Sequence, residues 1–103
     1  MTLILFHSKE SHFSKAIELY TKAIECNPNE ASYYGNRSFA YIKSEFYGYA
    51  LQDANKSIEL DPKYIKGYYR RASSNLALGK FKVALRDYET VNLVNYIIPK
   101  RLS

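Results

Sequence analysis

Four side chains of this sequence have the chemistry and the spacing needed to hold a carboxylate. Lys66 and Arg70 lie four residues apart in one expected helix, and Asn36 and Lys43 lie seven apart in another. Residues with these spacings share one face of an α-helix. Arginine offers a planar fork to a carboxylate, lysine a point charge, and asparagine an amide that can hold peptide backbone. The alternative interpretation is an ordinary solvated helix face.

An internal repeat indicates which elements must position these side chains. Small, aromatic and aliphatic residues recur every 34 positions, namely Ala16, Ala50 and Ala84; Phe13, Tyr47 and Phe81; and Ile17, Leu51 and Leu85. Pro28 and Pro62, which cannot continue a helix, keep the same step. This period is typical of helix–turn–helix repeats, which stack into a solenoid with a concave protein-binding surface. We therefore predict an all-α solenoid of about two and a half repeats, with the three alanines buried between helices.

The repeat register also assigns the individual helices and turns. Helices are expected over residues 14–26, 31–43, 47–60, 66–77 and 81–93. Asn29 and Asp61 stand where N-caps are wanted, and Gly79 stands where a left-handed residue is easiest. Asp53 and Asp87 are expected to be solvated charges that face away from the groove.

Both ends of the chain depart from the repeat pattern. We divide the sequence into residues 1–12, an atypical N-terminal segment with a degenerate first helix; 13–91, the repeat domain; and 92–103, an atypical tail. A short helix at Thr2 to Lys9 is expected to cover the stripe of Ile17, Tyr20 and Ile24 poorly. Solenoids normally cover their terminal apolar faces, so we predict self-association through uncapped ends.

Charge and composition limit the classes of function. The formal net charge of +5 favours an acidic partner. No apolar run is long enough to span a bilayer, and we expect no signal peptide. The single cysteine, Cys26, allows no internal disulfide; we expect a packing residue and a reducing compartment, the cytoplasm or nucleus. His7 and His12 have no other ligands at metal-binding spacing, so neither a metal nor a cofactor is expected.

Five strings of residues match a known family. They occupy residues 33–38, 47–51, 64–72, 77–81 and 84–91. Across residues 13–91 the chain resembles the tetratricopeptide-repeat domain of the serine/threonine protein phosphatase 5 family. This resemblance covers about three quarters of the sequence and leaves both ends outside the family pattern.

The resemblance implies a carboxylate clamp for the acidic C-terminal tail of heat-shock protein 90, which ends Glu-Glu-Val-Asp, or for another acidic peptide. Matched by position, the clamp residues are Asn36, Lys43, Lys66 and Arg70. The two other clamp positions fall on Met1 and Leu5, where the family's Lys and Asn are lost. The metal-binding motifs of the phosphatase catalytic domain are absent. The resemblance therefore implies a non-catalytic adaptor, a truncated relative of the phosphatase, with no small-molecule substrate and no membrane partner.

Two alternatives stay open at this point. The basic charge and the 11 tyrosines make nucleic-acid binding an alternative hypothesis. Such binding would weaken steeply with rising salt concentration. The irregular ends make a weakly functional truncated isoform or paralogue the second alternative. Thermal unfolding of such a chain would show no cooperative loss of helix.

Overall fold

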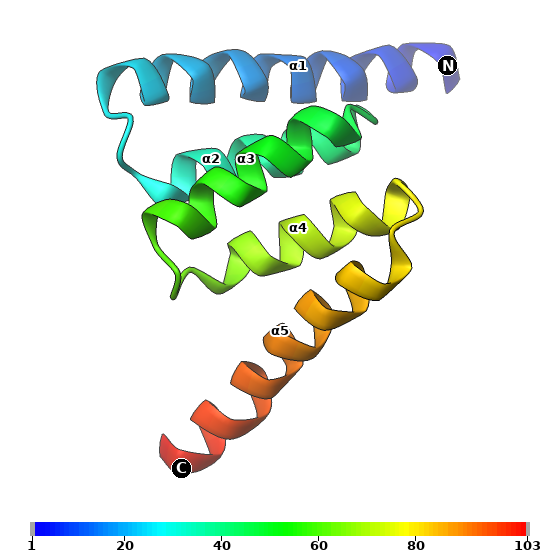
Figure 1. Ribbon diagram of the computed structural model, residues 1–103. Coiled ribbons are helices and arrows are strands. Elements are labelled where there is room, and N and C mark those ends of the chain that lie inside the picture. The colour runs from blue at the N-terminus through cyan, green and yellow to red at the C-terminus, as the bar shows by residue number, and fades with distance from the viewer. Residues whose placement is uncertain (1, 103) are drawn as a thin grey trace.

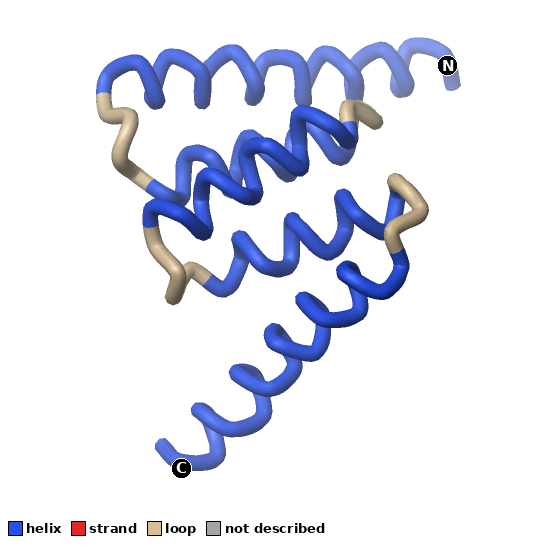
Figure 2. The backbone as a smooth tube through the Cα atoms, in the orientation of Figure 1, coloured by secondary structure: helices blue, strands red, loops and turns tan. Residues whose placement is uncertain are grey.

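The computed structural model describes the backbone of residues 2–102 and the side chains of residues 12–93. Within that backbone there are five helices and no strand, namely α1 Thr2–Cys26, α2 Ala31–Lys43, α3 Tyr47–Leu60, α4 Ile65–Ala77 and α5 Phe81–Leu102. The helices form a stack with α1 at one end and α5 at the other (Figure 1). Connections of three or four residues join them (Figure 2). The all-α prediction is confirmed.

Small residues let the helices approach closely. Most of the buried apolar side chains are alanines, and the set comprises Ala31, Tyr34, Ala40, Ala50, Ala54, Ala72, Ala84 and Val91. Ala50 and Ala84 are buried, as predicted from the repeat. The prediction is wrong for Ala16, which is only half-buried. Among the described contacts α1 packs against α2 alone, so Ala16 has a neighbouring helix on one side only.

The turns between repeats are held by residues that also recur every 34 positions. The hydroxyl of Tyr34 donates to the carbonyl of Pro28, and that of Tyr68 donates to the carbonyl of Pro62, both at 2.9 Å. Each tyrosine thus ties a first helix to the chain that leads into it. A proline ends the preceding helix, and a tyrosine fixes the direction of the next one.

The predicted N-caps are wrong. The residues at the cap positions of α2 and α4 are Glu30 and Tyr64, and neither side chain makes a capping hydrogen bond. Asp61 instead accepts from the backbone N–H of Lys63 at 3.0 Å. Short polar side chains readily bond the backbone two residues on, and around a proline that local turn replaces the helix cap.

The tight turns within repeats require a left-handed residue. Gly79 has φ of +81°, as the sequence predicted. One repeat earlier the same place is occupied by Glu45, with φ of +64°. A side chain at positive φ is strained, so the turn at Glu45 forms despite an unfavourable residue.

Both end helices are longer than predicted. One continuous helix runs from Thr2 to Cys26, in place of a separate helix at Thr2 to Lys9 and a second one over residues 14–26. The last helix continues past residue 93 to Leu102, in place of an irregular tail. The sequence contains no glycine or proline between Thr2 and Cys26, so nothing interrupts α1. The proposed division at residues 12 and 92 stays a prediction, and both boundaries fall inside helices.

Candidate peptide-binding groove

The candidate site lies where the first helices of two successive repeats, α2 and α4, meet. Gly35 on α2 makes this contact possible, because a Cβ atom there would stand 2.6 Å from the Tyr64 hydroxyl oxygen just before α4. Gly67 on α4 is equally tight, since its Cβ would meet the Ser57 hydroxyl oxygen at 2.6 Å. Without side chains at these two positions, the Tyr64 ring can lie against α2, and α4 can pack closely on Ser57 of α3.

The ring of Phe39 on α2 is the centre of this surface. The guanidinium carbon of Arg70 lies 4.5 Å from the ring centroid, and the amine of Lys43 lies 5.5 Å from it. Phe13 of α1 meets the same ring edge-on, with centroids 6.2 Å apart. Cations at these distances are attracted to the face of an aromatic ring. Two of the predicted site residues, Lys43 and Arg70, are therefore brought together from different helices.

The other two predicted residues lie on the same helix faces. Asn36 is half-buried on α2, three residues before Phe39 and seven before Lys43. Lys66 is exposed on α4, one turn before Arg70. Neither makes a described hydrogen bond or ion pair to the other site residues. Of the two lost clamp positions, Met1 lies outside the described residues and the side chain of Leu5 lies outside the described side chains.

Arg70 is a half-buried cation with no described counter-ion. Burial lowers the pKa of its guanidinium from the ordinary value, and Tyr64 and Tyr69 act in the opposite direction. Among side chains 12–93, no carboxylate lies within ion-pair distance of Arg70, Lys43 or Lys66. Taking a charge partly out of water is costly unless an anion compensates it. The surface is therefore suited to an incoming carboxylate.

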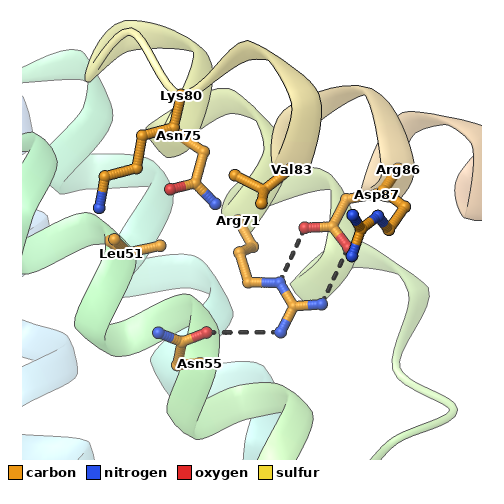
Figure 3. Close-up of a pocket in the computed structure, with 8 residues that line it drawn as sticks. All are labelled: Leu51, Asn55, Arg71, Asn75, Lys80, Val83, Arg86 and Asp87. Carbon is orange, nitrogen blue, oxygen red and sulfur yellow. Dashed lines mark hydrogen bonds and ion pairs between the residues drawn. The ribbon is translucent and has the colours of Figure 1, made fainter.

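The arginine next in sequence has the opposite surroundings. Arg71 forms a bidentate ion pair with Asp87 of α5, through two hydrogen bonds of 2.8 Å, and contacts Asn55 at 3.5 Å (Figure 3). The hydrogen bonding of Arg71 to the Asp87 carboxylate raises the pKa of the guanidinium, which burial alone would lower. Arg71 is therefore occupied within the fold and is not available to a peptide.

An equivalent arrangement occurs one repeat earlier. We call it a bracket: an arginine on one helix pairs with an aspartate on the following helix and contacts a polar side chain on the preceding helix. Arg37 on α2 holds Asp53 of α3 at 2.7 and 2.8 Å and contacts the Thr21 hydroxyl of α1 at 3.1 Å. The hydrogen bond with Asp53 raises the pKa of Arg37, and burial opposes it. Both aspartates are buried, so the expectation that Asp53 and Asp87 are solvated is wrong.

A signal for these brackets was present in the sequence. Arg37 and Arg71 are spaced by 34 residues, and so are Asp53 and Asp87. A pair of opposite charges that recurs with the structural repeat is part of the repeat, like the alanines. Within a single helix Asp53 and Asp87 look like solvated charges, and only their shared 34-residue spacing with Arg37 and Arg71 indicates ion pairs between helices.

Other candidate chemistry is limited in the described part of the chain. Cys26 is exposed, so the expectation of a packing residue is wrong. Among the described residues, no three His, Cys, Asp or Glu side chains gather closely enough to hold a metal ion. No helix in that part has an apolar stretch of the length needed to cross a bilayer.

Comparison with known proteins places the chain beside repeat domains. No protein-family model matches the sequence. Human serine/threonine-protein phosphatase 5 is 66% identical over 83 residues, which cover 81% of this chain and 17% of the phosphatase. The chain thus spans less than a fifth of that relative. The matched part is its repeat region and not its catalytic domain.

Two solved structures resemble the fold closely. The second TPR domain of Spaghetti (RPAP3), bound to the HSP90 peptide SRMEEVD, has a TM-score of 0.78 and 39% identity; the match covers 82% of this chain and 79% of that one. The second TPR domain of human RPAP3, in complex with the HSP70 peptide SGPTIEEVD, has a TM-score of 0.76 and 38% identity, with 84% and 72% covered.

Proposed function

This chain belongs to the tetratricopeptide-repeat family, and we propose that within it the chain acts as a non-catalytic adaptor for acidic C-terminal peptides of heat-shock chaperones. The peptides bound to the two similar RPAP3 domains both end in Glu-Glu-Val-Asp. Such a tail presents several carboxylates, including the terminal one. Basic groups from two helices are a suitable counterpart.

The observation that carries the proposal is the contrast between Arg70 and the two bracket arginines. Arg37 and Arg71 each have a carboxylate, whereas Arg70 lies over Phe39 with none among the described side chains. We assign Arg70 and Lys43 to the peptide carboxylates, with Lys66 as a further charge and Asn36 as a donor to the peptide backbone. Phe39 supplies an apolar surface between them.

The central experiment is a calorimetric titration of the whole chain with the peptide SRMEEVD. Arg70→Ala should weaken binding about 10- to 100-fold, because a hydrogen bond to a charged group contributes about 1.5–3 kcal/mol. A peptide with an amidated C-terminus should bind more weakly to the unmodified chain for the same reason.

The matched control is Arg86→Ala, which removes the same charge from an exposed position on α5. It should change the affinity less than about twofold. Arg71→Ala is unsuitable as a control, because it would break the bracket with Asp87. Equal weakening by Arg70→Ala and Arg86→Ala would indicate general charge attraction and would reject the groove.

The nucleic-acid alternative is tested with the same variants. Binding of a single-stranded oligonucleotide should be weak and should not depend selectively on Arg70. A steep loss of oligonucleotide affinity with rising salt, at affinities above that for the peptide, would favour the alternative.

A further inference from the structure

A second basic pocket lies between α3, α4 and α5, and it shares no residue with the candidate groove. Its volume is about 360 Å³, and Arg71, Lys80 and Arg86 are among the side chains that line it (Figure 3). Asn55 and Asn75 contribute amides, and Leu51 and Val83 contribute apolar wall. Arg71 follows Arg70 on α4, about 100° further round the helix, so the pocket opens on another face.

The equivalent positions of the preceding repeat are occupied by packed aromatic side chains. One repeat earlier, the positions of Asn75, Lys80 and Val83 are occupied by Tyr41, Phe46 and Tyr49. These three rings form a cluster: Tyr41 and Tyr49 stack with centroids 5.4 Å apart, and Phe46 meets each of them edge-on at 6.3 Å. The Arg37 guanidinium lies 5.8 Å from the Tyr41 ring centroid.

The arginine–aspartate ion pair beside these positions is the same in both repeats. Each has an arginine held by an aspartate on the following helix, with a polar side chain, Thr21 or Asn55, as the third contact. In the last repeat these three aromatic rings are replaced by the amide of Asn75, the amine of Lys80 and the small aliphatic side chain of Val83. Gln52 is replaced by Arg86. The pocket therefore results from substitutions that each add charge, add polarity or remove bulk.

Three polar side chains of the pocket, Asn75, Lys80 and Arg86, are not engaged by other described side chains. Asp87 is engaged by Arg71, whereas neither Lys80 nor Arg86 has a carboxylate within ion-pair distance among the described side chains. Asn75 is 6% exposed, and its amide makes no hydrogen bond to a described residue. No fully buried side-chain N or O in the described part lacks a partner, so the Asn75 amide must open into the pocket. Figure 3 shows this amide and Lys80 on one side of Arg71 and Arg86 on the other.

We propose that this pocket binds a phosphate monoester, either on a phosphorylated side chain of a partner protein or as a free molecule. Three cations and one carboxylate leave its lining with two net positive charges. A phosphate monoester carries a charge of about −1.5 to −2 at neutral pH and offers three strong acceptor oxygens. Lys80 and Arg86 supply the charge, and Asn75 supplies an amide donor. Leu51 and Val83 contact the carbon chain that bears the phosphate.

The experiment is an NMR titration of the whole isotope-labelled chain at constant ionic strength. The probes are inorganic phosphate, O-phosphoserine, and a short peptide containing phosphoserine, with the unphosphorylated peptide as control. The side-chain amide signals of Asn75 and Asn55 should shift with each phosphate probe. Tighter binding of the phosphopeptide than of O-phosphoserine assigns the ligand to a partner protein, and equal binding assigns it to a free monoester.

Two kinds of variant make the test specific. Lys80→Gln should weaken phosphate binding about 5- to 10-fold. The triple variant Asn75→Tyr, Lys80→Phe and Val83→Tyr copies the preceding repeat, fills the pocket and should abolish binding. Lys80 is exposed, so the single variant stays informative if the triple variant does not fold.

The matched control separates this proposal from the groove. Arg70→Ala should leave phosphate binding unchanged while it weakens binding of SRMEEVD. Equal weakening of phosphate binding by Arg70→Ala and Lys80→Gln would contradict phosphate binding in this pocket. Amide signals of Asn75 that do not respond to phosphate would contradict it as well. Either result would leave the peptide groove to be judged by its own titration.

Discussion

Arg70 and Arg71 are neighbours in the chain, and their surroundings give them different roles. Arg71 donates two hydrogen bonds to Asp87, and it connects α4 to α5. Arg70 rests on Phe39 without a described acceptor. One residue further along a helix is about 100° of rotation, and that is enough to separate a structural arginine from a candidate ligand-binding one.

The brackets make a stability prediction. Asp53→Ala should lower the free energy of unfolding by about 2–3 kcal/mol, because Arg37 would keep a mostly buried charge without its carboxylate. The Arg37 side chain is 18% exposed and that of Arg71 is 31% exposed, so Asp87→Ala should cost less. Urea denaturation followed by circular dichroism measures both.

The control for this prediction is Lys56→Ala, which removes an exposed pair with Glu59 at 3.7 Å. Exposed pairs contribute little, so the change should stay below about 0.5 kcal/mol. The brackets would not be stabilising if Asp53→Ala cost no more than Lys56→Ala.

Glu45 offers a stabilising change. Its φ of +64° is unfavourable for a residue with a side chain, whereas Gly79 occupies the same place in the next repeat. Glu45→Gly should raise the free energy of unfolding by about 0.5–1 kcal/mol, the relief of strain being partly offset by the entropy of a freer unfolded chain. Thermal unfolding, with Glu45→Ala as the comparison that removes the charge alone, measures this. A lower melting temperature for Glu45→Gly than for Glu45→Ala would contradict it.

At the scale of helices, the sequence predicted the interior elements closely and the ends poorly. The bounds of α2 and α3 agree with the prediction, and α4 begins one residue early at Ile65. Those helices end at prolines or tight turns that the sequence displays. Residues 2–13 and 94–102 lack the amphipathic period of the repeat, yet both stretches are helical, and α5 passes through Pro99, a residue type that normally ends a helix. The repeat pattern describes how helices pack against their neighbours within the array, so it does not predict how far the two terminal helices extend.

Alanine substitutions at Gly35 of α2 and Gly48 of α3 should change the free energy of unfolding in opposite directions. Gly35→Ala would put a methyl group 2.6 Å from the Tyr64 ring, and it should cost about 1–3 kcal/mol through overpacking of α2 against α4. Gly48 lies in the first turn of α3 with no atom within 4 Å of its missing Cβ, so Gly48→Ala should stabilise by up to about 1 kcal/mol. Chemical denaturation of both variants decides this. Two changes of the same sign would mean that close contact does not control the α2–α4 packing.

At the scale of the whole molecule, the two ends of the stack carry uncovered apolar residues. Phe81 and Leu85 on α5 are 67% and 58% exposed, whereas their equivalents one repeat earlier, Tyr47 and Leu51, are half-buried. At the other end, Leu19 on α1 is 54% exposed, although the equivalent position on α3 is the buried Asp53. Figure 1 shows α1 and α5 as the outermost helices. Within the described contacts, α1 packs only against α2 and α5 only against α4, whereas the inner helices have neighbours on both sides.

These ends predict head-to-tail association of the chain. The two faces differ, so a contact between them is heterologous and leaves a free end after each addition. Sedimentation velocity over a range of concentrations should therefore show a mass that rises without a plateau. Leu85→Lys and Leu19→Lys should each restore the monomer, because each places a charge in the apolar contact. Gln52→Lys adds the same charge at an exposed polar position and should leave the association unchanged. A monomer at every concentration would contradict the prediction, and a dimer that forms a plateau and resists Leu19→Lys would replace the head-to-tail contact with a symmetric one through α5.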